Sequence, residues 1–347
     1  MPSHFSNLTD GSVEPFPLDS HNSAPSIALE SFRPRKTLDF GSDGLVCSIG
    51  ILGDIIALSV YHPEHGIIAA NPFHQFPGGD KFWDSSFVRA YRKQFIDYFK
   101  QPGSGFGVRI PGIKTNMTPK LTDGRWPTIT YETEGLKAEV AFAITQGPSP
   151  LLINRLIIFN DTNEPKTAEV DLSGQVSINR ASYGQLTEAG PVPIPACLNQ
   201  SRYHEGIVLI ENPNLPATLA CALYLDGNRI ILNGPCETSA DPVSFNHTIR
   251  LEIPPYAKRE VMGYMTLQPT LGAKQLSSRL KFGHMPVLQP PSGFMLNDTK
   301  NSTSVERFVI RRTLDYLLSC CCIPIDGESV CVLTDHIALP LGWHRDN

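Results

Sequence analysis

The sequence predicts a mainly β fold, with antiparallel sheets packed as a sandwich and a shorter helical part after them. Short apolar segments rich in Val and Ile recur between residues 44 and 267, with turns roughly 8 to 12 residues apart. The chain of 347 residues also contains 30 Pro and 27 Gly, as is typical of a loop-rich β architecture. No repeat of fixed period is visible, which disfavours a propeller.

Five stretches carry the predicted strands. Residues 44–70 contain three apolar segments separated by turn residues, which indicates a β-meander, and residues 126–146 alternate on both sides of Glu-Gly-Leu. Residues 151–178 predict two strands joined by a polar turn at 160–166. Residues 206–234 predict three more strands, and residues 247–267 predict a final pair joined at Pro-Pro.

Two helices interrupt this pattern. Residues 85–103 place aromatic side chains on one helical face, which favours a helix packed on a sheet, although a ligand platform is the alternative. Residues 304–322 have helical spacing of apolar residues, begin with a Thr303–Glu306 capping box and end before Pro324. The segment between the sandwich and this second helix is rich in Pro and Gly, with a short helix expected near 274–281.

These patterns divide the chain into four parts. Residues 1–35 are polar and rich in Pro and Ser, and we expect a disordered leader. Residues 36–267 form the β-sandwich domain, residues 268–303 a linker, and residues 304–347 the start of a helical unit.

Composition narrows the class of protein. Hydrophobic residues make up 41% of the chain and charged residues 18%, as in a globular protein with a sizeable core. The net charge of −5 argues against a nucleic-acid partner, and the absence of a long apolar run argues against a membrane span. The N-terminus has no secretory signal pattern, which predicts a cytosolic protein, although secretion of a longer form stays open.

Two further sequence features, the glycosylation sequons and the cysteines, bear on the predicted cytosolic location. Seven Asn-x-Ser/Thr sequons occur, each a hint of a surface loop: Asn7, Asn116, Asn160, Asn199, Asn246, Asn297 and Asn301. The eight cysteines include three in a row, a spacing that suits neither a disulfide among them nor a zinc site. We therefore expect mostly reduced, apolar cysteines.

The C-terminal sequence "ALPLGWHRDN" contains the candidate binding residues Trp343, Arg345 and Asp346 in the pattern W-x-R-D. An indole can stack on the C–H face of a sugar, while a guanidinium donates to its hydroxyl groups and a carboxylate accepts from them. The alternative is a buried Trp beside a surface Arg–Asp pair.

A β-sandwich, a linker, an opening helix and then W-x-R-D together resemble the front end of the six-hairpin glycosidases, which include glucoamylase-like and phosphorylase-like enzymes. The resemblance covers residues 38–347 in architecture and rests on specific residues only at "LPLGWHRDN". It implies an antiparallel β-supersandwich followed by the first helices of an incomplete α/α barrel. It also implies that Trp343 stacks on a sugar while Arg345 and Asp346 hold its hydroxyl groups.

The catalytic residues of that family have no counterpart in this sequence. The resemblance places them on later barrel loops, beyond residue 347, so no catalytic residue can be assigned. We therefore expect a glycoside-hydrolase-like, carbohydrate-related protein that is inactive alone and would hydrolyse O-glycosyl bonds only within a longer chain. The alternatives are a carbohydrate- or small-molecule-binding module, and a scaffold reused in small-molecule biosynthesis.

Other candidate sites are weaker, and no cofactor or metal is expected. His62, Glu64 and His65 fall in a predicted hairpin turn, where solvated side chains are favoured over a metal site. Residues 71–80 contain Gly-Gly without the spacing of a phosphate-binding loop. The expected partners are a carbohydrate or other small molecule and a protein at the C-terminal helix, where missing barrel neighbours would leave an apolar patch exposed.

Overall fold

The computed structural model describes residues 27–28, 37–75 except 51 and 63, and 105–180 except 123–125 and 148. It also describes residues 197–276 except 235–237 and 270–271, and residues 303–331 except 326–327. The predicted helix at 85–103 and the residues Trp343, Arg345 and Asp346 lie outside these ranges.

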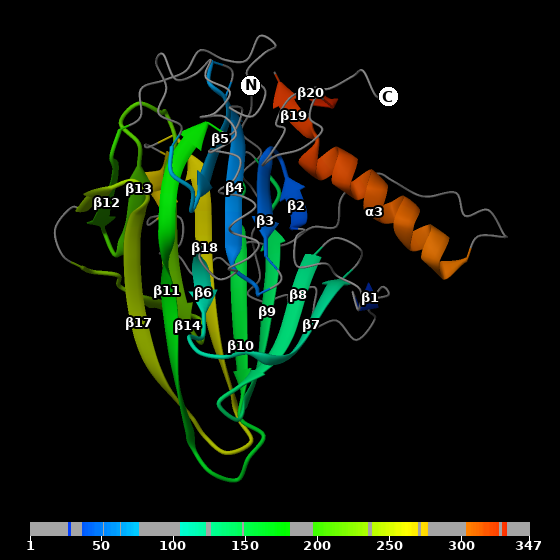
Figure 1. Ribbon diagram of the computed structural model, residues 1–347, viewed down its shortest axis with the longest axis vertical. Coiled ribbons are helices and arrows are strands. Elements are labelled where there is room, and N and C mark those ends of the chain that lie inside the picture. The colour runs from blue at the N-terminus through cyan, green and yellow to red at the C-terminus, as the bar shows by residue number, and fades with distance from the viewer. Residues whose placement is uncertain are drawn as a thin grey trace, which may run out of the picture.

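The predicted mainly β fold is confirmed, and the strands form two large antiparallel sheets (Figure 1). The larger sheet runs in the order β1-β7-β8-β9-β10-β18-β14-β13-β12-β16, with β15 paired to β14. Its strands are β1 (Ile27–Ala28), β7 (Thr115–Thr122), β8 (Trp126–Thr133), β9 (Leu136–Ile144), β10 (Leu152–Phe159), β12 (Asn199–His204), β13 (Ile207–Glu211), β14 (Thr218–Leu225), β15 (Asn228–Ile230), β16 (Thr238–Ala240) and β18 (Lys258–Gln268).

The second sheet runs in the order β17-β11-β5-β4-β3-β2, with β6 paired to β11. Its strands are β2 (Leu38–Ser42), β3 (Leu45–Ile49), β4 (Ile55–His62), β5 (Gly66–Asn71), β6 (Gly107–Arg109), β11 (Lys166–Arg180) and β17 (Val243–Ile253). One continuous core of buried apolar side chains, among them Phe40, Phe106 and Phe142, joins residues from both sheets. The sandwich is therefore a single packed unit rather than two separate sheets.

Four tight turns explain why neighbouring strands pair so regularly. The two-residue turns Asp43-Gly44, Glu134-Gly135, Glu205-Gly206 and Asp226-Gly227 all have positive φ at both residues. That geometry defines a type I′ hairpin turn, whose twist matches the twist of the paired strands, and Gly at the second position adopts it without steric cost. The Glu-Gly turn expected between β8 and β9 is one of these four.

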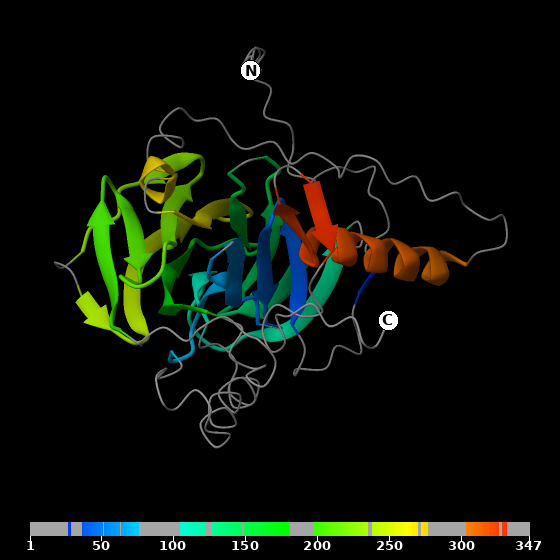
Figure 2. The same cartoon turned by 90° about the horizontal axis from the view of Figure 1, so that it is seen from above.

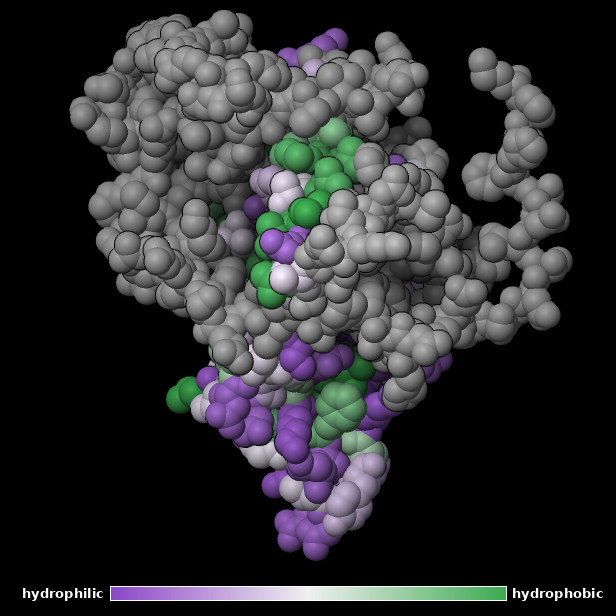
Figure 3. Space-filling view, turned by 90° about the vertical axis from the view of Figure 1, so that its right-hand side faces the viewer, coloured by the Kyte–Doolittle hydropathy of each residue, from purple (hydrophilic) through white to green (hydrophobic). Residues whose placement is uncertain are grey.

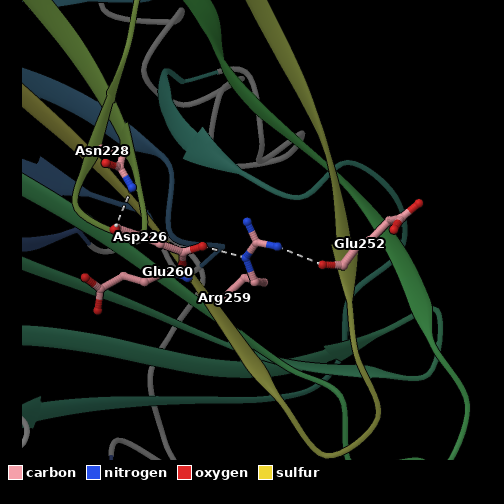
Figure 4. A network of polar contacts seen from close by, with 5 residues as sticks. All are labelled: Asp226, Asn228, Glu252, Arg259 and Glu260. Carbon is pink, nitrogen blue, oxygen red and sulfur yellow. Dashed lines mark hydrogen bonds and ion pairs between the residues drawn. The ribbon is translucent and has the colours of Figure 1, made fainter.

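At the far tip of the sandwich, an ion pair and hydrogen bonds join the Asp226-Gly227 hairpin to the β17–β18 hairpin (Figure 4). The Arg259 guanidinium donates to a carboxylate oxygen of Asp226 at 2.6 Å and to the Glu252 carbonyl at 3.0 Å. The backbone amide of Glu260 donates to the other Asp226 oxygen at 2.9 Å. Because these groups are largely exposed, we expect them to fix the tip's geometry more than its stability.

Helix α3 (Ser304–Cys320) packs beside β2 on the outside of the sandwich (Figures 1 and 2). The predicted capping box is present, with Thr303 and Glu306 exchanging hydrogen bonds, but the helix ends at Cys320 rather than at 322. Arg312 donates to the Asp39 carbonyl of β2, and Gly41 has no side chain where the Ser319 carbonyl approaches it. The absence of a Cβ at Gly41 thus lets the helix end lie against β2.

Residues after α3 differ from the helical continuation expected at 304–347. Strands β19 (Cys322–Ile325) and β20 (Glu328–Cys331) form an antiparallel hairpin. The sequences of the two strands contain Ile323, Ile325 and Val330, which favour strand pairing over further helix. Within residues 303–331 as described, α3 is followed by this hairpin and the expected barrel is not seen.

Helix α3 carries exposed apolar side chains, as expected for the C-terminal helix. These are Val305, Val309, Ile310, Leu317 and Leu318. Figure 3 shows the molecule from this side, with a band of apolar residues interrupted by polar ones and a mostly polar tapered end below. Among the helices of the described ranges, none is long and apolar enough to cross a bilayer.

Two other expectations need correction. Ile27 and Ala28 belong to the predicted disordered leader, yet they pair with Leu121 and Lys120 at the edge of the larger sheet. Asn160 and Asn199 belong to sequons predicted to lie in surface loops, yet both are buried, because their amides satisfy backbone groups inside the sandwich. Asn116 and Asn246 are exposed, but they lie in β7 and β17 rather than in loops.

Candidate functional site

A cavity of about 510 Å³ opens beside β6 and gathers charged side chains from four separate segments. The loop between β3 and β4 supplies Asp54, β6 supplies Arg109, the segment before β7 supplies Lys114, and β11 supplies Asp171. We call this the Asp54 cavity. Two cations and the Asp171 carboxyl group in one cavity of this size can orient a small polar ligand.

A tight turn places Asp54 at the inner end of the cavity. The Gly50 amide donates to the Asp54 carbonyl at 2.9 Å, and the Gly53 amide donates to the Gly50 carbonyl at 3.0 Å. The next residue, Ile55, pairs through its backbone with Phe106 just before β6. The chain therefore turns sharply enough to bury an aspartate between two strands.

The Asp54 carboxyl group is buried without a well-formed hydrogen bond to any described residue. Its residue is 4% exposed, and both carboxylate oxygens are shielded from solvent. Burial raises the pKa of Asp54, while its own amide, Lys114, the Gly105 amide and Arg109 lower it in part. Desolvation is the larger effect, so the neutral carboxylic acid is favoured over a wider pH range than usual.

Lys114 lies close to Asp54 without forming an ion pair with it. Its ammonium group donates to the Leu52 carbonyl at 3.1 Å and lies 4.9 Å from the centre of the Tyr131 ring. Burial lowers the pKa of Lys114, Asp54 raises it, and Arg109 lowers it further. The lysine is held by a carbonyl and an aromatic face rather than by the Asp54 carboxyl group.

Arg109 and Asp171 form the opposite wall. They are direct partners across the β6–β11 pairing. Arg109 donates from Nε to the Ser173 hydroxyl at 3.1 Å, and Asp171 accepts from the Thr248 hydroxyl at 2.6 Å. These contacts fix a donor and an acceptor on a rigid strand pair.

Asn154 of β10 supports this wall through a hydrogen bond to β6. Its side-chain oxygen accepts from the Val108 amide of β6 at 2.7 Å, which is possible because Gly107 leaves room beside it. Its Nδ2 is buried and has no hydrogen-bond partner in the described part of the chain. An unused donor beneath β6 adds to the polar character of this region.

A separate buried polar cluster is, by contrast, closed on itself. Asp241 accepts from the Gln75 amide at 2.9 Å, from Asn199 at 3.1 Å and from the Ser177 hydroxyl. Asn71 and Asn179 bond each other through their side-chain amides. Because these groups satisfy one another, the cluster is best explained as an internal support between β5, β11 and β12.

The cysteines in the core have no features of catalytic nucleophiles. Cys47, Cys221 and Cys320 are buried and free, as the sequence predicted, and Cys321 is also buried. Burial raises the pKa of Cys221 to about 12 and that of Cys47 and Cys320 well above the usual value. A thiol that stays protonated is a poor nucleophile.

The sequence-predicted site residues are only partly tested. The His62 and His65 rings lie 4.9 Å apart, and His62 accepts from the Glu64 amide, which matches the expected hairpin turn. In the residues that the structure describes, no group of three His, Cys, Asp or Glu side chains is placed to hold a metal. The saccharide role of Trp343, Arg345 and Asp346 stays a prediction.

Sequence reasoning did not find the Asp54 cavity. Its charged residues are separated by up to 117 positions, from Asp54 to Asp171, and none belongs to a known motif. One local signal was present, because Gly-Asp directly before an apolar strand places a carboxyl group at the edge of the core. Convergence of that carboxyl group with Lys114 depends on how the sheets pack.

Comparison with known proteins gives a structural likeness but no family. No protein-family model matches the sequence. No curated protein matches it either. A protein described as a kojibiose phosphorylase, from the human microbiome, has 7% identity and a TM-score of 0.38 over 84% of this chain and 38% of its own. The chain thus spans well under half the length of that protein.

Two smaller solved structures are matched along nearly their whole length. One is described as an aldose 1-epimerase from Escherichia coli K12, with 12% identity and a TM-score of 0.31 over 67% of this chain and 99% of its own. The other is a galactose mutarotase-like protein from Clostridium acetobutylicum, with 8% identity and a TM-score of 0.33 over 72% and 99%. Because all three TM-scores lie below 0.5, these likenesses do not establish a shared fold.

The raised pKa of Asp54 predicts an unusual pH dependence of stability. The folded protein binds the Asp54 proton more tightly than the unfolded chain does, so stability from this group is complete below the usual pKa of 3.8 and is lost as pH rises through the folded value. We expect Asp54→Asn to raise Tm at pH 7, with the gain shrinking as pH falls toward 4. Differential scanning fluorimetry across that range measures it.

The matched control for this experiment is Asp161→Asn. Asp161 is exposed, and Lys137 lowers its pKa, so its replacement is expected to leave Tm unchanged or slightly lower at pH 7. If Asp54→Asn instead lowers Tm at pH 7, by an amount that shrinks as pH falls toward 4 and below, Asp54 stabilises the fold as an ionised partner of Lys114.

Proposed function

We propose that this chain is a glycoside-hydrolase-like, carbohydrate-directed protein that binds a saccharide and does not hydrolyse it alone. The observation that carries the proposal is the Asp54 cavity, where Lys114 and Arg109 supply donors and Asp171 supplies an acceptor. A saccharide displays hydroxyl groups that both donate and accept hydrogen bonds, and it needs mixed partners of this kind. The W-x-R-D residues Trp343, Arg345 and Asp346 are proposed as a second contact with the sugar.

The burial of Asp54 supports binding without hydrolysis at this cavity. Glycoside hydrolysis needs a carboxylic acid that reaches the glycosidic oxygen and a second carboxylate facing the same bond. Both Asp54 oxygens are shielded from solvent, so the acid favoured by its raised pKa is not placed to touch a substrate. In the proposal, Asp54 acts on its neighbour Lys114, whose pKa it raises.

Isothermal titration calorimetry of the full chain tests the proposal, with a panel of malto- and gluco-oligosaccharides as titrants. Lys114→Met and Arg109→Met each remove a charged donor, and we expect affinity to fall by roughly tenfold or more. Lys137→Met is the matched control, because Lys137 is exposed and pairs with Asp161 away from the cavity. Incubation with the same sugars is expected to release no new reducing ends.

The outcomes separate the two proposed contacts. If Trp343→Ala abolishes binding and Lys114→Met does not, the Asp54 cavity is not the saccharide site. If no oligosaccharide binds at millimolar concentration, the carbohydrate proposal fails as a whole. Release of reducing ends by the purified chain would contradict the absence of hydrolysis.

A further inference from the structure

The hairpin that follows α3 places two cysteines directly opposite each other. Strands β19 and β20 are antiparallel, and their register pairs Cys322 with Cys331 and Pro324 with Ser329. In the described part of the chain these two strands pair only with each other, just beyond the end of α3 (Figure 1). We call this unit the Cys322–Cys331 hairpin.

The proline in β19 shows which kind of pair the two cysteines form. Opposite residues in an antiparallel ladder alternate between hydrogen-bonded pairs, which exchange two N–H···O bonds, and non-hydrogen-bonded pairs. Pro324 has no amide hydrogen, so its pair with Ser329 is of the non-hydrogen-bonded kind. Cys322 and Cys331 each lie two residues further along their strand, so they too form a non-hydrogen-bonded pair.

This kind of pair has the geometry that a cross-strand disulfide requires. In a non-hydrogen-bonded pair the two α-carbons lie about 4.5 Å apart, and opposite residues of an antiparallel pair share one face of the sheet. The α-carbons of a disulfide lie roughly 4.4 to 6.8 Å apart. The backbone register therefore allows a bond between these two cysteines without rearrangement of the strands.

The two cysteines that precede this pair are placed differently. Cys320 and Cys321 lie at the end of α3, are buried, and are not in register with β20. Cys322 is only half-buried. A two-stranded hairpin is also marginally stable by itself, and its transient opening gives small reagents further access to the pair.

We propose that Cys322 and Cys331 form a reversible disulfide by exchange with a small disulfide such as oxidised glutathione. The Cys322 thiolate attacks one glutathione sulfur, which forms a mixed disulfide and releases one glutathione thiolate. The Cys331 thiolate then attacks the Cys322 sulfur, closes the cross-strand bond and releases the second glutathione. The cysteines lose two protons and two electrons, which convert one glutathione disulfide into two glutathione thiols.

This modification site is independent of the saccharide proposed for the Asp54 cavity. Its bond closes the loop of residues 322–331 and so restricts the open forms of the hairpin. In the oxidised protein the hairpin is held by a covalent bond, whereas in the reduced protein it depends on strand pairing and on its contact with α3.

Peptide mapping of the full chain tests the proposal. The protein is equilibrated with oxidised glutathione, its remaining thiols are blocked with N-ethylmaleimide, and the chain is cut before its aspartates. Cysteine 322 then lies on the peptide 315–325 and cysteine 331 on the peptide 326–334. We expect these two peptides to be linked, and dithiothreitol treatment before blocking to reduce the linked product by about tenfold or more.

Single substitutions identify the partners within the linked peptides. Cys322→Ser and Cys331→Ser are each expected to abolish the link. Cys321→Ala is expected to retain it, which separates Cys322 from its neighbour on the same peptide. The matched control is Cys197→Ser, because Cys197 is also half-buried but lies before β12, and this variant is expected to retain the link.

Hydrogen exchange of the wild-type chain gives a second test that does not depend on the folding of a variant. Oxidation is expected to slow amide exchange in the Cys322–Cys331 hairpin by about tenfold and to leave exchange in β17 and β18 unchanged. The proposal is overturned if oxidised glutathione produces no linked peptides, if the link persists in Cys322→Ser, or if the hairpin exchanges equally fast in both redox states.

Discussion

Replacing Asn160 by Ala is expected to lower the free energy of unfolding by about 3 kcal/mol, because two or more backbone carbonyls lose a buried donor. Asn160 is 2% exposed, and its Nδ2 lies 2.8 Å from the Glu164 carbonyl, 3.0 Å from that of Ile253 and 3.1 Å from that of Pro254. Its Oδ1 accepts from Thr162. This one side chain joins the β10–β11 loop to the β17–β18 hairpin.

Urea unfolding followed by circular dichroism measures this loss. Asn228→Ala is the control, since Asn228 is exposed and its amide makes one long contact to the Asp226 carbonyl, and a change within about 0.5 kcal/mol is expected. Asn160→Asp keeps the acceptor but turns a carboxylate oxygen toward carbonyl oxygens, so it should destabilise at least as much as Ala. Wild-type stability in Asn160→Ala would show that the loop and the hairpin are held by other contacts.

Gly174→Ala is the second change with a large expected effect. A Cβ at this position of β11 would overlap Cα and Cβ of Phe106 and lie 2.8 Å from the Gly105 carbonyl oxygen. Two of these atoms belong to the backbone that leads into β6, and the Phe106 Cβ is fixed directly to it, so none can move away as the end of a flexible side chain could. We expect a loss of about 3 kcal/mol, at the upper end of overpacking effects.

The same substitution also tests whether packing in the core positions the residues of the Asp54 cavity. A shift of β6 would move Arg109, so saccharide affinity is expected to fall together with the urea midpoint. Gln175→Ala changes the exposed neighbour of Gly174 and should alter neither quantity. If the urea midpoint is unchanged but saccharide affinity is lost, β6 shifts to make room for the new Cβ and only the Asp54 cavity is disturbed.

Most of the sandwich could be predicted because its strands are defined by local patterns. The Glu-Gly turn between β8 and β9, the polar turn between β10 and β11, and the Pro-Pro turn between β17 and β18 each fall where the sequence placed them. The capping box at Thr303 did the same for the start of α3. Such signals depend only on a few neighbouring residues.

What the sequence did not reveal depends on contacts between distant segments. Nothing near Ile27 indicates that it would pair with Leu121, and nothing near Asn160 indicates that the β17–β18 hairpin would bury it. The Asp54 cavity was missed for the same reason, since its walls meet only when β6 packs on β11. The W-x-R-D hypothesis was local and stays a prediction, because those residues lie outside the described chain.

The burial of Asn160 has a consequence for N-linked glycosylation. An oligosaccharide attached to this sequon would be carried by the same nitrogen that contacts the Glu164, Ile253 and Pro254 carbonyls. The first sugar would occupy space now filled by packed backbone, so attachment and the native sandwich exclude each other at this residue. A chain modified at Asn160 during synthesis could not close the β17–β18 hairpin over that loop, whereas Asn116 and Asn246 leave room for a glycan.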